Sequence, residues 1–318
     1  MKKSTVFALA GLGAAAGIGA FAIHSYLDVM YKETIPKGLA KRVMEMTDNG
    51  EYEPLHKMCE ESMKWVDSQD IETITMNSDR GEELKGFLLM ADKPSKVFTV
   101  FAHGYRANHR GDSANFFKYY HDKGFNYLAV DHTASGESGG DWVGFDYYES
   151  QDMLKWLNYL IDRFGEDISI TLHGVSMGGA TVCQMADKVP PQVKLIVADC
   201  PYTSAIDEFT SVAAGAGIKK TAPYILKGMN YLNKRLAGYD LADTDVRQSV
   251  INSRVPMLFV HGAADDFVPT YMGEELYNLC GNEKDILIVD NAVHASSIVV
   301  DTEGYQKKLD EFIDKYIK

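Results

Sequence analysis

The chain has 318 residues, of which 46% are apolar and 24% are charged, a composition that excludes a disordered or repetitive protein and suits one large α/β domain. Its formal net charge of -13 at pH 7 argues against nucleic-acid binding, because neutralising phosphates requires a basic face. We therefore expect no nucleic-acid partner.

An uncharged, Gly- and Ala-rich stretch occupies residues 4–23, directly after Lys2 and Lys3. As a helix, about 20 residues span the roughly 30 Å of a bilayer core. Residues 1–27 are therefore predicted to be a membrane anchor or a signal peptide. Ala20-Phe21-Ala22 would serve as the small-residue cleavage site of a signal peptide, whereas the length of the apolar run favours an anchor.

The charges that flank this stretch give the expected location. Lys2 and Lys3 would keep the amino terminus in the cytoplasm. The catalytic part would then lie outside the cytoplasm, anchored to the membrane, or secreted if the segment is cleaved. Basic residues on the other flank oppose this orientation: Lys32, Lys37, Lys41 and Arg42.

Residues 28–70 are expected to form a helical lead-in, and from residue 71 onward short apolar runs alternate with helix-length segments. Residues 77–82 suit a hairpin turn between the first two runs, and the later spacing requires right-handed crossovers. This pattern predicts an α/β fold over residues 71–318, an eight-stranded, mostly parallel sheet flanked by helices. The expected strands are Ile71–Met76, Leu84–Met90, Val97–Ala102, Tyr127–Val130, Ile168–Leu172, Val193–Ala198, Met257–Val260 and Asp285–Val289.

The interval between Asp199 and Val255 is too long for a plain crossover and contains short helical pieces such as Tyr224–Leu236. We expect a small helical cap over the carboxyl edge of the sheet at about residues 203–252. A surface insertion without a role at the site is the alternative. Apolar residues of this interval would hold an acyl group or dock the cap on the sheet: Ile206, Phe209, Val212, Ile218, Tyr224, Ile225 and Leu226.

A serine framed by glycines, Gly174-Val175-Ser176-Met177-Gly178-Gly179, stands between a strand pattern and a helix pattern. In so tight a turn the serine takes a strained backbone conformation, and the residues two places away on either side have no room for side chains. Ser176 is therefore the candidate nucleophile. The same motif occurs at Gly136-Glu137-Ser138-Gly139-Gly140, but no helix follows it, so we expect Ser138 to lie in a loop.

A serine nucleophile requires a base and an acid that orients the base. Asp265 follows the strand 257–260 and His294 follows the strand 285–289, which gives the chain order Ser, Asp, His. Asp266 is a rival for the acid. Two further residues are weaker rivals: Asp290 is expected at a strand end, and His261 is expected to be a structural histidine.

Two backbone N–H groups are expected to stabilise the oxyanion that forms during acyl transfer. One is the amide of Met177, at the start of the helix after the nucleophile. The other is the amide of Tyr105, in the loop after the strand 97–102, where Gly104 permits close approach. His103 is expected to pack behind the site.

The cysteines and the other histidines have no spacing typical of a metal site. We therefore predict no metal. Cys183 and Cys200 fall in buried elements and count first as small apolar residues. A disulfide between Cys59 and Cys280 stays open as an alternative.

Taken together, the motifs His103-Gly104, Gly174–Gly179, His261-Gly262-x-x-Asp265-x-x-Val268-Pro269 and His294 resemble the α/β-hydrolase superfamily. The similarity covers about residues 71–318 and is greatest to bacterial membrane-anchored, esterase- or lipase-like members related to the prolyl-oligopeptidase catalytic domain. The segment Asp131–Gly140 departs from such members, because it lacks an arginine and the first glycine of their usual pattern.

The resemblance implies a serine hydrolase with a Ser-His-Asp triad and without a metal or organic cofactor. The expected reaction is cleavage of carboxylic esters through an acyl-enzyme on Ser176, with a small-molecule ester or acyl substrate. A peptidase, a thioesterase or an acyltransferase would use the same residues. A catalytically silent, membrane-anchored binding protein is the alternative of another class. The natural substrate, the acyl-chain length and the oligomeric state stay open.

Overall fold

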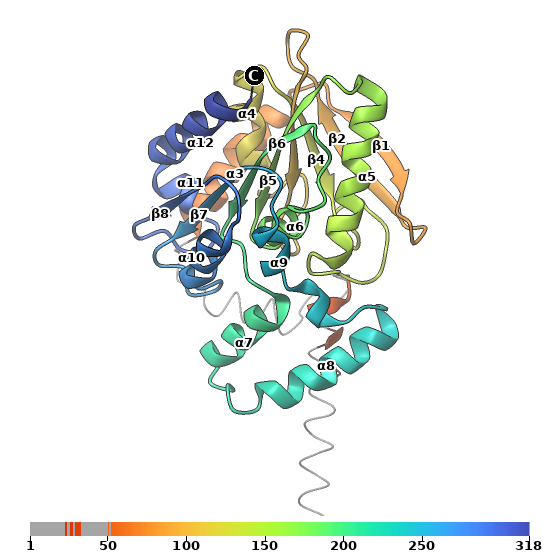
Figure 1. The fold of residues 1–318 in the computed structure, drawn as a ribbon, viewed down its shortest axis with the longest axis vertical. Helices are drawn as coiled ribbons and strands as arrows, with labels where there is room; N and C mark the ends of the chain where they lie inside the picture. The colour runs from red at the N-terminus through yellow and green to blue at the C-terminus, as the bar shows by residue number, and fades with distance from the viewer. Residues whose placement is uncertain (1–22, 24–25, 28, 33–49, 51, 318) are drawn as a thin grey trace, which may run out of the picture.

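In the computed structural model, one eight-stranded sheet forms the centre of the molecule, with the strand order β1-β2-β4-β3-β5-β6-β7-β8 (Figure 1). The model describes residues 23, 26–27, 29–32, 50 and 52–317. The strands are β1 (Glu72–Asn77), β2 (Glu83–Leu89), β3 (Val97–Ala102), β4 (Asn126–Asp131), β5 (Ser169–Val175), β6 (Val193–Asp199), β7 (Met257–Gly262) and β8 (Lys284–Val289).

Strands β1 and β2 are antiparallel to each other, and β2 is antiparallel to β4. All other neighbours pair in parallel, from β4 and β3 through to β7 and β8. The predicted eight-stranded, mostly parallel sheet is thus confirmed. Because parallel strands end at one edge, the loops after β3, β5, β6, β7 and β8 gather there.

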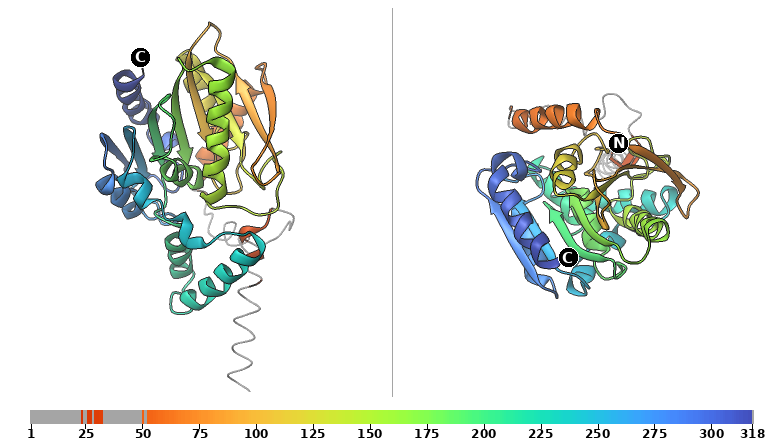
Figure 2. Two further views of the ribbon diagram at one scale, coloured as in Figure 1. Left: turned by 45° about the vertical axis from the view of Figure 1, so that its right-hand side comes forward. Right: turned by 90° about the horizontal axis from the view of Figure 1, so that it is seen from above.

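Helices cover both faces of the sheet, and each face has its own buried core (Figures 1 and 2). One core includes side chains of α5 (Tyr147–Phe164), α6 (Met177–Gln184) and α10 (Thr270–Leu279). The other core includes side chains of α3 (Glu53–Val66), α4 (Ala114–Asp122), α11 (Ser297–Val300) and α12 (Thr302–Tyr316).

Apolar stripes on two of these helices face the cores. On α5 the buried residues include Met153, Leu157 and Leu160. On α12 the stripe comprises Tyr305, Leu309, Phe312 and Ile313. A helix buries such a stripe because its side chains recur on one face with a period near 3.6 residues.

Between β6 and β7 the chain forms α7 (Ala205–Gly215), α8 (Ala222–Leu236), the 3-10 helix η1 (Leu241–Thr244) and α9 (Arg247–Ile251). In Figures 1 and 2, α7 and α8 lie beyond the carboxyl edge of the sheet, apart from the helices on its faces. Arg247 connects this region to the domain by ion pairs with Asp207 of α7 (2.7 Å) and Glu275 of α10 (2.6 Å). We refer to residues 203–252 as the cap.

Part of the amino-terminal region packs against the cap and the neighbouring loops. Tyr26 and Met30 are fully buried, and the Tyr26 hydroxyl donates to Asn233 Oδ1 of α8 at 3.4 Å. The amide of Val143 donates to the carbonyl of Met30. The expected membrane-directed stretch, residues 4–23, lies outside the described residues except for Ile23. In the described part of the chain, no helix is both long enough and apolar enough to cross a bilayer.

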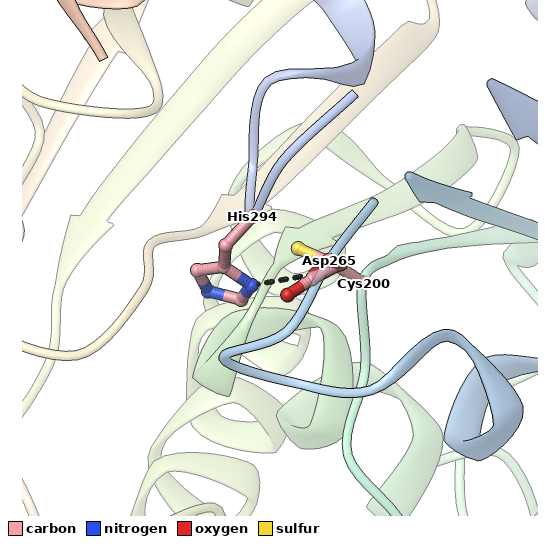
Figure 3. A group of neighbouring side chains, drawn as sticks. All are labelled: Cys200, Asp265 and His294. Carbon is pink, nitrogen blue, oxygen red and sulfur yellow. Dashed lines mark hydrogen bonds and ion pairs between the residues drawn. The ribbon is translucent and has the colours of Figure 1, made fainter. Parts of the chain in front are cut away.

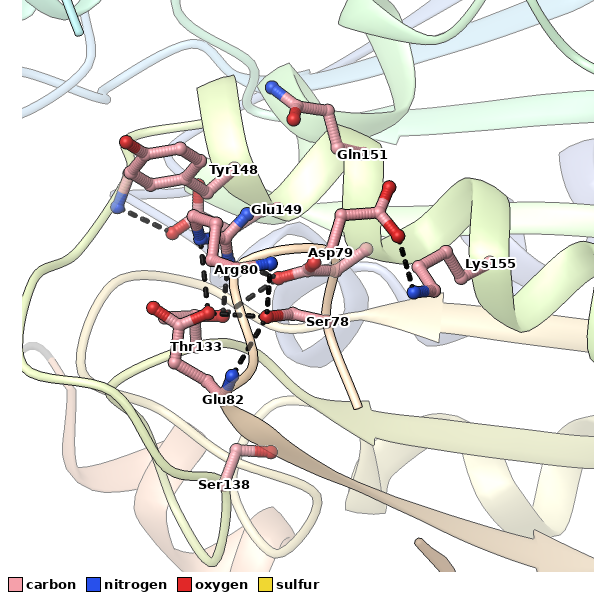
Figure 4. A network of polar contacts seen from close by, with 12 residues as sticks. Ser78, Asp79, Arg80, Glu82, Thr133, Ser138, Tyr148, Glu149, Gln151 and Lys155 are labelled. Carbon is pink, nitrogen blue, oxygen red and sulfur yellow. Dashed lines mark hydrogen bonds and ion pairs between the residues drawn. The ribbon is translucent and has the colours of Figure 1, made fainter. Parts of the chain in front are cut away.

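The turn expected at residues 77–82 joins β1 and β2 and is held by polar contacts to α5 and to the loop after β4 (Figure 4). The Arg80 guanidinium donates to Thr133 Oγ1 and to Asp152 Oδ2, both at 2.9 Å. It also stacks on the Tyr148 ring, 3.8 Å from the ring centroid. These contacts fix the antiparallel edge of the sheet to the helix beside it.

Candidate active site

Ser176 lies between the end of β5 and the start of α6, at the carboxyl edge of the sheet. Its backbone has φ 57° and ψ -119°, a conformation that non-glycine residues rarely adopt. The amide of Ser176 donates to the carbonyl of Asp199 at 2.8 Å, which ties the turn to β6. The turn therefore has the strained geometry that the glycine-framed motif predicts.

The glycines around Ser176 are required by close backbone approach. A Cβ on Gly174 would overlap the carbonyl of Gly178, and a Cβ on Gly178 would overlap the carbonyl of Ala102 in β3. A Cβ on Gly179 would come within 2.6 Å of the carbonyl oxygen of Asp199. Any side chain at these positions would push α6 away from the sheet.

Two hydrogen bonds connect Ser176, His294 and Asp265. Nε2 of His294, in the loop after β8, lies 2.8 Å from the Ser176 Oγ. Nδ1 of the same ring lies 2.8 Å from Asp265 Oδ2, in the loop after β7 (Figure 3). The second oxygen of Asp265 accepts from the amides of Phe267 (3.1 Å) and Val268 (2.9 Å). These backbone donors hold the carboxylate in one orientation toward the ring.

The alternative candidates for the acid and the base do not take these positions. Asp266 and Asp290 are both exposed to solvent, whereas Asp265 is buried. His261 is fully buried, and its Nε2 lies 2.9 Å from the carbonyl of Val268 and 3.4 Å from Asp265 Oδ2. His261 therefore approaches the same carboxylate oxygen as His294, a contact that the sequence does not reveal.

The loop after β3 packs against the serine. A Cβ on Gly104 would lie 3.4 Å from the Ser176 Cβ, and the Gly104 amide donates to Asp112 Oδ2 at 2.8 Å. The Tyr105 hydroxyl donates to the carbonyl of Val29 at 2.7 Å, which fixes the residue after Gly104. Met177 is the first residue of α6 and is buried. The segments that carry the Tyr105 and Met177 amides thus flank the Ser176 side chain.

Part of the chain matches a known family. A family model described as the alpha/beta hydrolase fold matches residues 100–220. Over these residues the chain is similar to the α/β-hydrolase family.

Individual proteins extend the similarity to other parts of the chain. Protein YqkD of Bacillus subtilis is 27% identical over 297 residues, which are 92% of this chain and 91% of YqkD. The solved esterase Pf2001 of Pyrococcus furiosus has a TM-score of 0.64 and 19% identity, over 79% of this chain and 93% of its own. An acylaminoacyl peptidase of Pyrococcus horikoshii has a TM-score of 0.60 and 16% identity, over 78% of this chain and 42% of its own.

The second glycine-framed serine, Ser138, has a different environment (Figure 4). The Ser138 hydroxyl donates to the carbonyl of Asp131 at 2.6 Å and accepts from the amide of Lys85 at 2.9 Å. No helix begins at Ser138, which lies in the loop after β4 as expected. Its hydroxyl therefore connects two strands rather than facing a base.

The electrostatics of the Asp265–His294 pair favour a charged acid. Burial alone would raise the pKa of the Asp265 carboxyl, but the charge of His294 and hydrogen bonds from His261 and His294 outweigh burial and lower this pKa well below its usual range. Burial alone would lower the pKa of His294. The negative charge of the Asp265 carboxylate has the larger effect and raises the pKa of His294 well above its usual value. Asp265 is therefore ionised at any physiological pH.

Cys200 lies beside this pair, which its sequence context does not indicate (Figure 3). One ligand-type atom each from Cys200, Asp265 and His294 lies within 4.8 Å of the others. Burial raises the pKa of the Cys200 thiol to about 12, so the sulfur is protonated at neutral pH. Zinc would need the thiolate, and tetrahedral ligand atoms stand roughly 3.4 Å apart. The 2.8 Å separation of Asp265 and His294 instead fits a hydrogen bond.

All four cysteines are free thiols, so the alternative of a Cys59–Cys280 disulfide does not hold in this structure. The Cys59 sulfur lies 3.4 Å from the carbonyl of Arg110, between α3 and the loop that precedes α4. Cys280 is buried at the end of α10.

Glu208, on the first turn of α7, is a second residue that the sequence does not single out. Its side chain is 4% exposed, and neither carboxyl oxygen has a hydrogen-bond partner among the described residues. Burial raises the pKa of Glu208 to about 8, with smaller opposing effects from His294 and Asp265. The cap therefore contributes a carboxyl group that is neutral at pH 7. The pKa of this group depends on the charges of His294 and Asp265.

Proposed function

We propose that this α/β-hydrolase is a carboxylesterase that cleaves carboxylic esters through an acyl-enzyme on Ser176. The observation that carries the proposal is the continuous pair of hydrogen bonds from Ser176 Oγ through the His294 ring to Asp265. A serine hydroxyl becomes a nucleophile only when a base removes its proton, and a base acts only when its ring is held in one tautomer.

In the first half-reaction, Ser176 Oγ attacks the ester carbonyl carbon while its proton moves to His294 Nε2. The tetrahedral intermediate then collapses, the C–O bond to the alcohol breaks, and the leaving oxygen takes the proton from Nε2. In the second half-reaction a water molecule attacks the acyl carbon and gives its proton to Nε2. This proton returns to Ser176 Oγ as the acid leaves. Asp265 keeps Nδ1 protonated and stabilises the imidazolium in both halves.

The carbonyl oxygen becomes negative in each tetrahedral intermediate. We assign its stabilisation to the backbone amides of Tyr105 and Met177, on the two segments that flank Ser176. Backbone donors are effective in this role because they need no reorganisation at the moment of reaction. Removing one such donor typically lowers kcat by about 10²- to 10³-fold.

The preference for esters rests on the esterase among the structural relatives. The acylaminoacyl peptidase among them supports peptide or acylated-amine cleavage as the second candidate. A thioesterase or an acyltransferase would use the same residues, because the triad does not select the leaving group. We further propose that the uncharged stretch 4–23 directs the protein to a membrane, with the catalytic part outside the cytoplasm.

The test is active-site labelling with a fluorophosphonate probe, together with turnover of short-chain p-nitrophenyl esters. We expect labelling at Ser176, and Ser176→Ala should remove both labelling and turnover. Ser138→Ala is the matched control and should keep both. Turnover that survives Ser176→Ala would refute the triad, and a folded wild-type protein without labelling or turnover would favour a silent binding protein.

A further inference from the structure

Helix α8 of the cap presents two opposite faces. One face is buried against the domain and includes Ile225, Met229 and Asn233. The opposite face carries Tyr224 and Tyr231, which are seven residues apart and therefore nearly aligned on the helix. Tyr224 is 69% exposed and Tyr231 is 62% exposed.

Two exposed aliphatic side chains lie at the ends of this helix. Ile218, in the turn before α8, is 37% exposed, and Leu236, at its last residue, is 49% exposed. We call Ile218, Tyr224 and Tyr231, with the basic residues near them, the outer face of the cap. Exposed apolar and aromatic side chains gathered on one element commonly mark a contact surface.

The charge of this face is opposite to that of the molecule. Residues 209–239 contain no aspartate or glutamate, although the whole chain carries a formal charge of -13. The same residues include five exposed basic side chains, of which Lys234 forms an ion pair with Asp240 at 2.6 Å: Lys219, Lys220, Lys227, Lys234 and Arg235. A basic patch on an acidic protein selects a partner that carries dense negative charge.

The amino-terminal segment contacts the buried face of α8. The Tyr26 hydroxyl donates to Asn233 on α8, so this segment lies against the cap helix. On the same segment, Ile23 is 49% exposed and Leu27 is 38% exposed. Ile23 is the last residue of the uncharged stretch 4–23.

We propose that the outer face of the cap rests on an anionic bilayer surface. Tyrosine rings are favoured at the headgroup level, where the ring is buried and the hydroxyl stays hydrated. Lysine and arginine beside them attract anionic headgroups, and each contributes about fivefold in affinity near such a surface. The cap and the carboxyl edge of the sheet would then face the membrane, and esters dissolved in the bilayer would be the nearest substrates.

The test uses the full chain, purified in mild detergent and reconstituted into vesicles. Tyr224→Trp introduces a fluorophore on the outer face, and doxyl-labelled lipids quench a tryptophan only when they reach it. Met90→Trp is the matched control. Met90 is 42% exposed and follows β2, which is antiparallel to β4, so it lies at the opposite edge of the sheet. The native tryptophans provide a common background in both variants.

We expect quenching of Tyr224→Trp in phosphatidylcholine vesicles that contain phosphatidylglycerol, and little in pure phosphatidylcholine. Reversing three exposed cap lysines (Lys219→Glu, Lys220→Glu, Lys227→Glu) should weaken the contact on the order of a hundredfold. Three exposed lysines on α3 and α12 serve as the charge-matched control and should have no effect: Lys57→Glu, Lys64→Glu and Lys307→Glu.

Quenching of Tyr224→Trp no greater than that of Met90→Trp would overturn the proposal, as would quenching without dependence on the anionic lipid. If the chain instead forms a dimer that the cap reversals dissociate, the outer face is a contact between two copies. The readout is fluorescence, so it succeeds or fails independently of ester turnover by Ser176.

Discussion

Oδ2 of Asp265 faces two histidines at once, Nδ1 of His294 at 2.8 Å and Nε2 of His261 at 3.4 Å. The other oxygen of Asp265 accepts two backbone amides. The carboxylate is therefore surrounded by donors although it is buried, and it neither needs to take up a proton nor has freedom to rotate. His294 inherits this fixed orientation, which is what a base for Ser176 requires.

Asp265→Asn should lower kcat for p-nitrophenyl esters by about 10⁴-fold, because the amide stabilises the wrong tautomer of His294. Asp266→Asn is the matched control next to it in sequence. Asp266 is exposed, so its replacement should change kcat less than about twofold. Steady-state kinetics of the two purified variants provide the comparison. A harmless Asp265→Asn with a damaging Asp266→Asn would move the acid to the neighbouring residue.

The rate should depend on pH through His294. The imidazole must be neutral to accept the serine proton, and the Asp265 carboxylate raises the pKa of His294 well above its usual value. The value of kcat/KM should therefore rise with pH and level off only at alkaline pH. In Asp265→Asn the residual activity should level off at lower pH, because the negative charge that raises the pKa of His294 is gone. A pH–rate profile from pH 5 to pH 10 measures both, and an unchanged midpoint in the variant would contradict this coupling.

The parts of the site that depend on local sequence could be predicted. Gly174, Gly178 and Gly179 are dictated by the approach of the backbone around Ser176, and the loops that carry Asp265 and His294 follow directly from strand ends. Cys200 and Glu208 could not be predicted in the same way. A cysteine after a buried strand and a glutamate in an amphipathic helix have ordinary local patterns, and only the tertiary fold turns them toward His294. Which residues of the cap are buried could not be predicted either. Tyr224 and Ile225 are both apolar and adjacent in sequence, yet Tyr224 is exposed and Ile225 is buried.

Gly178→Ala should abolish soluble, active protein, because a Cβ at this position would overlap the carbonyl of Ala102. The backbones of α6 and β3 would have to separate, which we expect to cost at least about 3 kcal/mol. Gly215→Ala is the control. Gly215 ends α7 and has no atom within 4 Å of an added Cβ, so alanine should leave the free energy of unfolding unchanged or raise it by up to about 1 kcal/mol. Chemical denaturation measures the difference, and a stable Gly178→Ala would contradict the close approach of α6 and β3.

Glu208→Gln should make the protein more stable relative to wild type as pH rises. Burial raises the pKa of Glu208 in the folded chain to about 8, from 4.5 for the free group, so between these values the folded state holds a proton that the unfolded state has released. The free energy of unfolding of the wild type therefore falls with pH across this window, by up to about 1.4 kcal/mol per pH unit from this group. Above about pH 8 the group loses its proton in the folded state too, and its contribution becomes constant.

Glutamine has the same shape and does not titrate. The difference in Tm between variant and wild type should thus grow from pH 5 to pH 8 and then level off. Other buried carboxyls, such as Asp199, are present in both proteins and cancel in the difference. A Tm difference that stays constant over this range would mean that Glu208 is ionised in the folded protein.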